Sequence, residues 1–152
     1  MTPQKVSIPN EIILGAVSRL VSEGHTTVIL TKGNSMSPFI RGDRDSVELS
    51  APGDLKVGDI ALAQITPGHY VLHRIFRIDG DSITLKGDGN LNGTEHCSKA
   101  DICAVAIRIL RPGHKAVDCS DPAFMRRSTR WRELPYQVRR YTLAIYRRIK
   151  FL

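Results

Sequence analysis

Apolar and polar positions recur with different periods along the chain. Between residues 7 and 23 the apolar side chains return every three or four positions, and Gly24 follows directly. This spacing places them on one face of a helix, and a glycine just beyond the last turn is a common helix stop. The residues that define this face are Ile12, Ile13, Ala16, Val17, Leu20 and Val21. We therefore predict an N-terminal helical segment within residues 1–25.

From residue 26 onward, short runs rich in β-branched and aromatic residues follow one another. Pro, Gly and Asp separate these runs, as is typical of turns between strands. The runs cover residues 26–31, 46–49, 59–65, 69–78, 82–86 and 102–110. Their order predicts a mainly β domain of the α+β class over residues 26–112, which forms a folded or half-closed β-barrel.

The C-terminal segment combines a helical apolar pattern with most of the excess positive charge. Residues 126–150 contain nine Arg or Lys residues and one acid, Glu133. Apolar residues recur at helical spacing at Leu134, Val138, Tyr141, Ile145, Ile149 and Leu152, while Arg139, Arg140, Arg147, Arg148 and Lys150 occupy much of the remaining arc. This pattern predicts a linker over residues 113–133 and a basic amphipathic helix over residues 134–152.

Such a helix is compatible with several partners. It can pack on its own domain, lie on an anionic membrane, bind an acidic protein or contact nucleic acid phosphates. A single N-terminal helix is too little for a helix-turn-helix reader, so nucleic acid is not an expected partner. Packing on the domain and peripheral contact with an anionic membrane or an acidic partner, through the basic residues listed above, remain as alternatives.

Length and composition indicate one domain, large enough for a hydrophobic core, with additional segments at both ends. The chain has 152 residues, 41% of them hydrophobic, and a formal net charge of +7. It contains no run of about 20 uncharged apolar residues and no secretory-signal pattern, which predicts a cytoplasmic protein. The three cysteines, Cys97, Cys103 and Cys119, are odd in number and lack CxxC spacing, so we expect free thiols, in keeping with a reducing compartment.

The candidate chemistry lies in a serine-bearing turn and a later histidine-bearing strand. Ser35 belongs to the sequence Gly-Asn-Ser-Met-Ser-Pro-Phe-Ile-Arg-Gly-Asp at 33–43, and His73 lies in Tyr-Val-Leu-His-Arg-Ile at 70–75. A serine hydroxyl becomes a good nucleophile when a base removes its proton, and histidine suits that role near neutral pH. These residues predict a Ser35–His73 dyad, with Asp88 as the candidate carboxylate that orients the imidazole.

The alternation of the histidine-bearing strand predicts the surroundings of His73. Val71, His73 and Ile75 fall on one face, because side chains on a strand alternate with a period of two. Apolar neighbours disfavour the imidazolium and keep the imidazole neutral, ready to accept a proton. His69 lies four residues before His73, a separation of about 13 Å on a strand, so the two cannot chelate one metal ion as a helical pair could.

Four short sequence boxes, in this order, resemble those of type I signal peptidases and the related LexA-like autoproteases. They are Gly-x-Ser-Met-x-Pro-x-Ile-x-Gly-Asp at 33–43, Val-Gly-Asp-Ile at 57–60, Val-Leu-His-Arg-Ile at 71–75 and Leu-Lys-Gly-Asp-Gly-Asn at 85–90. The similarity covers residues 26–108. Most bacterial members carry lysine where this chain has His73, so it is most similar to the histidine-type signal peptidases of the endoplasmic reticulum and archaea, without their membrane anchor.

The resemblance implies a serine endopeptidase that cleaves a peptide or precursor protein without cofactor or metal. It implies that the Ser35 backbone N–H supports the oxyanion, with Gly33, Asn34, Met36 and Pro38 as the other residues of the nucleophile box. In the histidine-type enzymes a further aspartate follows the last box, whereas here residues 91–95 read Leu-Asn-Gly-Thr-Glu. The resemblance therefore leaves the third catalytic role open.

Two other function classes differ from the endopeptidase in what they require of the sequence. A LexA-like self-cleaving regulator requires a DNA-binding domain and a scissile Ala-Gly or Cys-Gly bond ahead of Ser35, and neither is found in the sequence. A catalytically silent barrel would act as a binding module through its basic C-terminal helix. Such a barrel predicts that replacing Ser35 leaves the biological activity intact, which distinguishes it from the enzyme.

Overall fold

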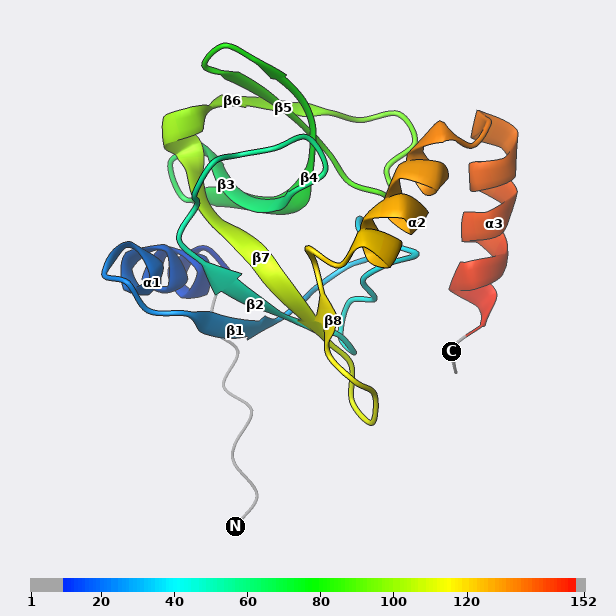
Figure 1. The fold of residues 1–152 in the computed structure, drawn as a ribbon, viewed down its shortest axis with the longest axis horizontal. Helices are drawn as coiled ribbons and strands as arrows, with labels where there is room; N and C mark the ends of the chain where they lie inside the picture. Colours follow the sequence, from blue (N-terminus) through cyan, green and yellow to red (C-terminus); the bar gives the residue numbers. More distant parts are fainter. Residues whose placement is uncertain (1–9, 150–152) are drawn as a thin grey trace.

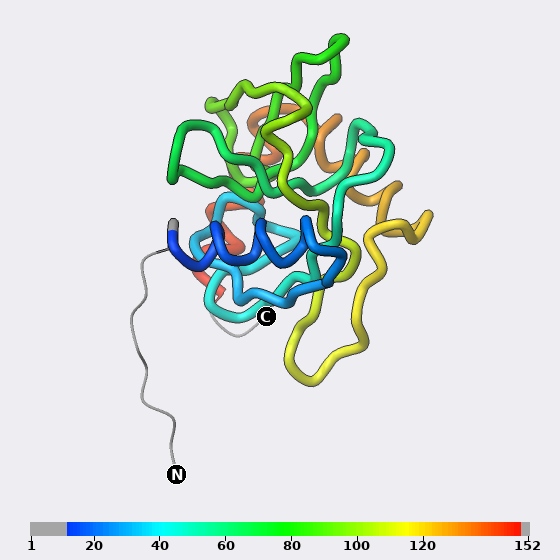
Figure 2. Tube along the Cα trace, turned by 90° about the vertical axis from the view of Figure 1, so that its left-hand side faces the viewer, coloured from blue at the N-terminus to red at the C-terminus, as the bar shows by residue number. Residues whose placement is uncertain are grey.

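The computed structural model describes residues 10–149 (Figures 1 and 2). Within them the chain begins with the helix α1 (Asn10–Ser22) and continues through eight strands. The strands are β1 (Thr27–Leu30), β2 (Ser46–Ser50), β3 (Ile60–Thr66), β4 (His69–Asp79), β5 (Ser82–Lys86), β6 (Glu95–Ser98), β7 (Ile102–Leu110) and β8 (Val117–Asp118). A short 3-10 turn, η1 (Lys99–Asp101), precedes β7, and the helices α2 (Pro122–Glu133) and α3 (Tyr136–Arg148) follow β8.

The strands form one antiparallel sheet. Its order is β1-β2-β7-β3-β4-β5-β6, and β8 pairs with β7 outside this path. The β3–β6 part curls over on itself (Figure 1), so that β6 approaches β3 without pairing with it. The structure is thus an α+β fold with a strongly curved antiparallel sheet, as the strand pattern predicts.

The curvature gives the sheet two adjoining apolar clusters. One cluster lies between α1, the turn after β1 and strands β2, β3 and β7, and includes Val21, Met36 and Leu62. The other lies inside the curled β3–β5 part and includes Ile75 and Ile83. Small alanines in β3 and β7 are fully or almost fully buried, which allows the strands to curve closely around this interior.

The helices lie at opposite ends of the molecule, α1 at one end and α2 and α3 at the other, as both views show (Figures 1 and 2). Val21 of α1 and Phe124 of α2 nevertheless belong to the same buried cluster. α2 has a well-defined start, because the Asp121 side chain accepts a hydrogen bond from the Phe124 N–H at 3.1 Å and Pro122 occupies the first turn. Phe124, Ser128 and Trp131 form its buried face.

The elements agree closely with the sequence-based prediction where periodicity was strong. The six expected strands all form, with ends shifted by one residue at most, and α1 occupies residues 10–22 of the expected 7–23; residues 7–9 lie outside the described part. β6 was not predicted, because its sequence Glu-His-Cys-Ser has no apolar alternation. The segment expected as a linker, residues 113–133, instead contains β8 and α2.

Candidate active site

Ser35 lies in the turn between β1 and β2, which we call the serine turn (residues 31–45). Backbone hydrogen bonds close this turn at its base: Asp43 N–H donates to Thr31 O at 2.8 Å, and Thr31 N–H donates to Asp45 O at 3.0 Å. Gly42 packs directly on Gly33, and a Cβ at position 42 would lie 2.0 Å from the Gly33 carbonyl oxygen. The glycine at 42 is therefore required by the close approach of the two sides of the turn.

A second loop, residues 86–90 at the end of β5, holds the serine turn in place. We call it the box loop. The Gly89 N–H donates to Ser35 O at 2.8 Å, and a Cβ on Gly87 would lie 2.3 Å from the same oxygen. Because two backbones meet here without room for side chains, the box loop fixes the position of the serine backbone. Residues 33–43 and 85–90, which are remote in sequence, thus form one unit.

His73 lies on β4, opposite Ala61 of β3, and only 7% of its surface is exposed. Val71 and Ile75 pack in the cluster of the curled sheet, as expected from the strand alternation. The imidazole Nδ1 forms a short hydrogen bond with Glu95 Oε1, at the start of β6. Nε2 makes no hydrogen bond to any residue in 10–149.

The carboxylate beside His73 is therefore that of Glu95, and the expected role of Asp88 is corrected. Asp88 accepts hydrogen bonds from Arg74 Nε at 3.0 and 3.1 Å and from Arg74 Nη2 at 2.5 Å. Arg74 neighbours His73 in sequence but points to the other face of β4, where Asp88 is held. Asp88 is thus the partner of a buried arginine and does not contact the candidate base.

The Arg74–Asp88 pair connects the elements that surround the site. Arg74 Nη1 also donates to Gly58 O at 2.9 Å, and the Trp131 Nε1–H of α2 donates to Asp88 O at 2.9 Å. These bonds connect β4, the box loop and α2 around one buried guanidinium. The box loop in turn holds the Ser35 backbone. Asp88 therefore helps to position the candidate nucleophile by fixing the box loop, and it does not contact His73.

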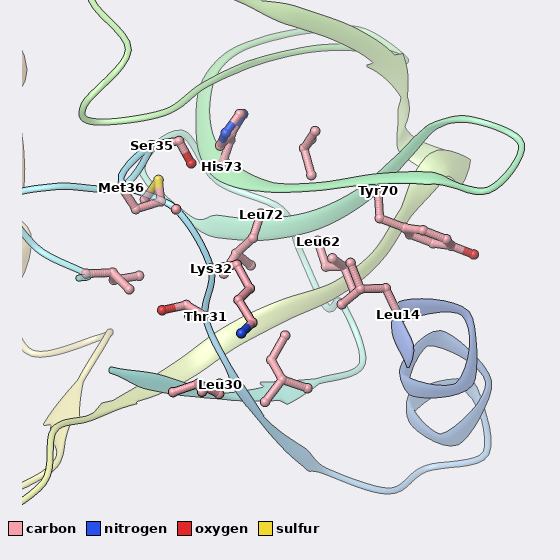
Figure 3. A pocket seen from close by; sticks show the side chains of 14 residues that line it. Leu14, Leu30, Thr31, Lys32, Ser35, Met36, Leu62, Tyr70, Leu72 and His73 are labelled. Carbon is pink, nitrogen blue, oxygen red and sulfur yellow. The ribbon is translucent and has the colours of Figure 1, made fainter. Parts of the chain in front are cut away.

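Ser35 and His73 line the same pocket, a cavity of about 220 Å³ between the serine turn, β1, β4 and α1. Figure 3 shows both at one end of it, next to Met36, with Leu14 and Tyr70 at the other end. Most of the other lining residues are aliphatic, among them Ile29, Leu62 and Leu72. Ser35 Oγ forms no hydrogen bond within residues 10–149. The pocket therefore brings together a half-buried hydroxyl, a buried imidazole and an apolar wall.

The remaining residues of the nucleophile box have distinct surroundings. Gly33 and Asn34 are exposed, and Asn34 O accepts a hydrogen bond from Ser37 N–H at 3.1 Å, which makes it a turn residue by its backbone. Met36 is 4% exposed and belongs to the core. Pro38 is half-buried on another side of the turn, beside Phe39. Within the described residues, the Ser35 N–H has no backbone acceptor.

Glu95 was missed because no element was predicted around it. It stands five residues beyond Asn90, the last residue of the box, and begins a strand of polar sequence. One feature of the sequence could have indicated Glu95: it is an acidic residue in the segment where the histidine-type enzymes that this sequence resembles have a further aspartate. Only the pairing of β6 with β5, in which Glu95 lies opposite Leu85, brings the carboxylate to β4.

The basic C-terminal helix is only partly covered by the domain. Leu143 is buried, whereas Tyr141 and Ile145 are 66% and 60% exposed, so much of the predicted apolar stripe does not pack on the sheet. Arg139 is half-buried beside α2, and the side chains of Arg140, Arg147 and Arg148 are exposed. Lys150 lies outside the described residues.

The cysteines are free and half-buried, as predicted. Burial raises the pKa of the Cys97 thiol and of the Cys119 thiol to about 11, so both stay protonated and poorly nucleophilic near neutral pH. Among residues 10–149, no helix has the length and apolar character needed to cross a membrane.

Comparison with known proteins does not assign the chain to a family. No protein-family model matches it, and a search of curated proteins found no significant match.

Proposed function

We propose that this protein is a serine endopeptidase whose catalytic triad is Ser35, His73 and Glu95. The observation that carries the proposal is the contact of His73 Nδ1 with the Glu95 carboxylate, in a buried site that opens on the pocket containing Ser35. A carboxylate at Nδ1 holds the proton on that nitrogen and leaves Nε2 as the base, which is the arrangement that serine nucleophiles use on unrelated folds.

In the proposed reaction, Nε2 of His73 removes the Ser35 hydroxyl proton while Oγ forms a bond to the scissile carbonyl carbon. The carbonyl oxygen becomes an oxyanion, which accepts a hydrogen bond from the Ser35 N–H. Collapse of this intermediate breaks the carbon–nitrogen bond, and the imidazolium gives its proton to the leaving amine. A water molecule then attacks the acyl carbon while His73 takes its proton. The bond between the acyl carbon and Ser35 Oγ breaks, and the imidazolium returns the proton to Oγ. Glu95 orients the imidazole and stabilises its charged form.

The substrate class that we propose is a peptide or an extended segment of a precursor protein. The pocket is lined largely by aliphatic residues and has a volume of about 220 Å³. It would accept a small or medium apolar side chain next to the scissile bond, since a charged side chain would lose its hydration among the aliphatic residues and Lys32 is the one Lys or Arg in the lining.

The test is labelling of Ser35 by a serine-directed acylating probe such as a β-lactone, followed by intact mass and peptide mapping. We expect labelling of the wild type at Ser35, none in Ser35→Ala, and rates lower by about a hundredfold or more in His73→Ala and Glu95→Gln. Ser37→Ala is the matched control, because Ser37 lies in the same turn and its buried hydroxyl has no hydrogen-bond partner within the described residues.

The outcomes separate the candidate functions. If neither His73→Ala nor Glu95→Gln slows labelling, His73 is not the base and Glu95 does not orient it. A folded wild-type protein that resists several probe types would instead favour the catalytically silent binding module. Glu133→Gln, an exposed carboxylate on α2, should label as the wild type does.

A further inference from the structure

A second, smaller pocket of about 100 Å³ lies behind the box loop, where β4 and β5 meet α2 and α3. Four cationic side chains line it: Arg74, Lys86, Arg132 and Arg139. Asp88 is the one acidic residue among the lining residues. This concentration of positive charge involves four different elements or loops, so the tertiary structure assembles it.

Asp88 does not neutralise all four cationic side chains, because its carboxylate is already paired with Arg74. Both Asp88 oxygens accept from Arg74, which leaves Lys86, Arg132 and Arg139 without an ion pair to any residue in 10–149. Lys86 Nζ stands 5.5 Å from the centre of the Phe76 ring, and Arg139 donates from Nε to Leu134 O at 3.1 Å. Their remaining N–H groups are available to a ligand.

Arg132 is the most unusual of the three. Its Nη1 is buried and forms no hydrogen bond with the described residues, while Nη2 makes a long bond of 3.4 Å to Thr129 Oγ1. Burial, and then the neighbouring Arg74, lower the pKa of the Arg132 guanidinium. A buried donor without an acceptor is unfavourable, and so is the repulsion between neighbouring positive charges. One bound anion would accept a hydrogen bond from the donor and reduce the repulsion.

We propose that this pocket binds a phosphate group, either as inorganic phosphate or as the end of a phosphomonoester. The volume suits one tetrahedral oxyanion, and lysine and arginine donors that converge from several directions match its oxygens better than they match a planar carboxylate. The pocket is too small for a whole nucleotide. This site is separate from the proposed peptidase chemistry, and its test does not depend on Ser35.

The first measurement is isothermal titration of the full-length protein with inorganic phosphate, against sodium chloride of equal ionic strength. We expect saturable binding to the wild type and affinities lower by about tenfold or more in Lys86→Ala and in Arg139→Ala, since each loses a charge-assisted contact. Arg140→Ala is the matched control: Arg140 follows Arg139 on α3 but is exposed and does not line the pocket. It should bind phosphate as the wild type does.

A second arm identifies the source of the phosphate group. Vesicles of phosphatidylcholine with phosphatidic acid present a phosphomonoester headgroup, and exposed Tyr141 and Ile145 on α3 lie on the same helix as Arg139. Binding to these vesicles that is lost in Arg139→Ala and retained in Arg140→Ala would assign the pocket to a lipid headgroup; binding of inorganic phosphate alone would assign it to a soluble phosphate.

Two results would overturn the proposal. One is the absence of saturable binding to both inorganic phosphate and the vesicles. The other is binding that Arg140→Ala weakens as much as Lys86→Ala and Arg139→Ala do, because that pattern reports general attraction to a positive surface and not a built site. Circular dichroism of each variant confirms that the fold is retained.

Discussion

Replacement of Asp88 by alanine should destabilise the protein strongly. The Asp88 side chain is 1% exposed and that of Arg74 is 2% exposed, so the variant leaves a buried guanidinium with no counterion. Three hydrogen bonds to the carboxylate, at 3.0, 3.1 and 2.5 Å, are lost at once. Breaking such a buried pair from one side costs about 3–5 kcal/mol of unfolding free energy, a large part of the total stability of a domain of this size.

Urea denaturation followed by tryptophan fluorescence measures this loss directly, because Trp131 contacts Asp88. With a slope of about 2 kcal/mol per molar urea, the midpoint should fall by about 1.5–2.5 M. Asp54→Ala is the control, since Asp54 is exposed and makes no ion pair within residues 10–149. The double variant Arg74→Met/Asp88→Leu should recover much of the stability, because it removes the unpaired charge.

A loss below about 1 kcal/mol in Asp88→Ala would refute this reasoning, since it would mean that Arg74 is not left unpaired in a dry site. The same variant also separates the two carboxylates of the site. Glu95→Gln should change stability little, because the Glu95 side chain is 23% exposed, while it should slow acylation of Ser35. Asp88→Ala should lower stability far more than Glu95→Gln does, and it should slow acylation less, because it disturbs the Ser35 backbone only through the box loop.

Two further predictions concern the serine turn. Gly87→Ala should lower the free energy of unfolding by about 1–3 kcal/mol and slow Ser35 labelling, because its Cβ would lie 2.3 Å from Ser35 O. Gly93→Ala is the control, since a Cβ there would have no atom within 4 Å. In the same urea and labelling assays it should behave as the wild type does. Burial by itself raises the pKa of Asp45, but hydrogen bonds from Arg44 and the Arg41 amide outweigh it and leave the pKa of this carboxyl below its usual value. The unfolded chain therefore takes up the proton first as pH falls, so the stability that Asp45 contributes is fully present above about pH 4 and is lost at lower pH. The urea midpoints of wild type and Asp45→Asn should converge on acidification, and a constant gap between them would contradict the assignment.

Sequence periodicity was sufficient for most of the secondary structure. Strands such as β5 and β7 and the helix α1 were predictable because one face of each is buried, so that the apolar positions repeat with the period of the element. α2 was not predicted, because four of its twelve residues are arginine and few are apolar. Its buried face consists of only Phe124, Ser128 and Trp131, which is too little to produce a clear pattern.

The candidate nucleophile and base could also be chosen from the sequence. A serine between Gly33 and Pro38 predicts a constrained turn, and a histidine between Val71 and Ile75 predicts a buried imidazole on a strand. These inferences are local, since they depend on neighbours a few residues away. Both residues then line one pocket in the folded chain.

The partners of Arg74 and His73 were decided by the tertiary structure alone. Asp88 and Glu95 lie seven residues apart and both follow β5, so composition and spacing cannot tell which of them reaches His73. The alternation of β4 sends His73 and Arg74 to opposite faces, the box loop brings Asp88 to Arg74, and the pairing of β6 with β5 brings Glu95 to His73. Such assignments depend on contacts between separate strands, which local sequence preferences do not specify.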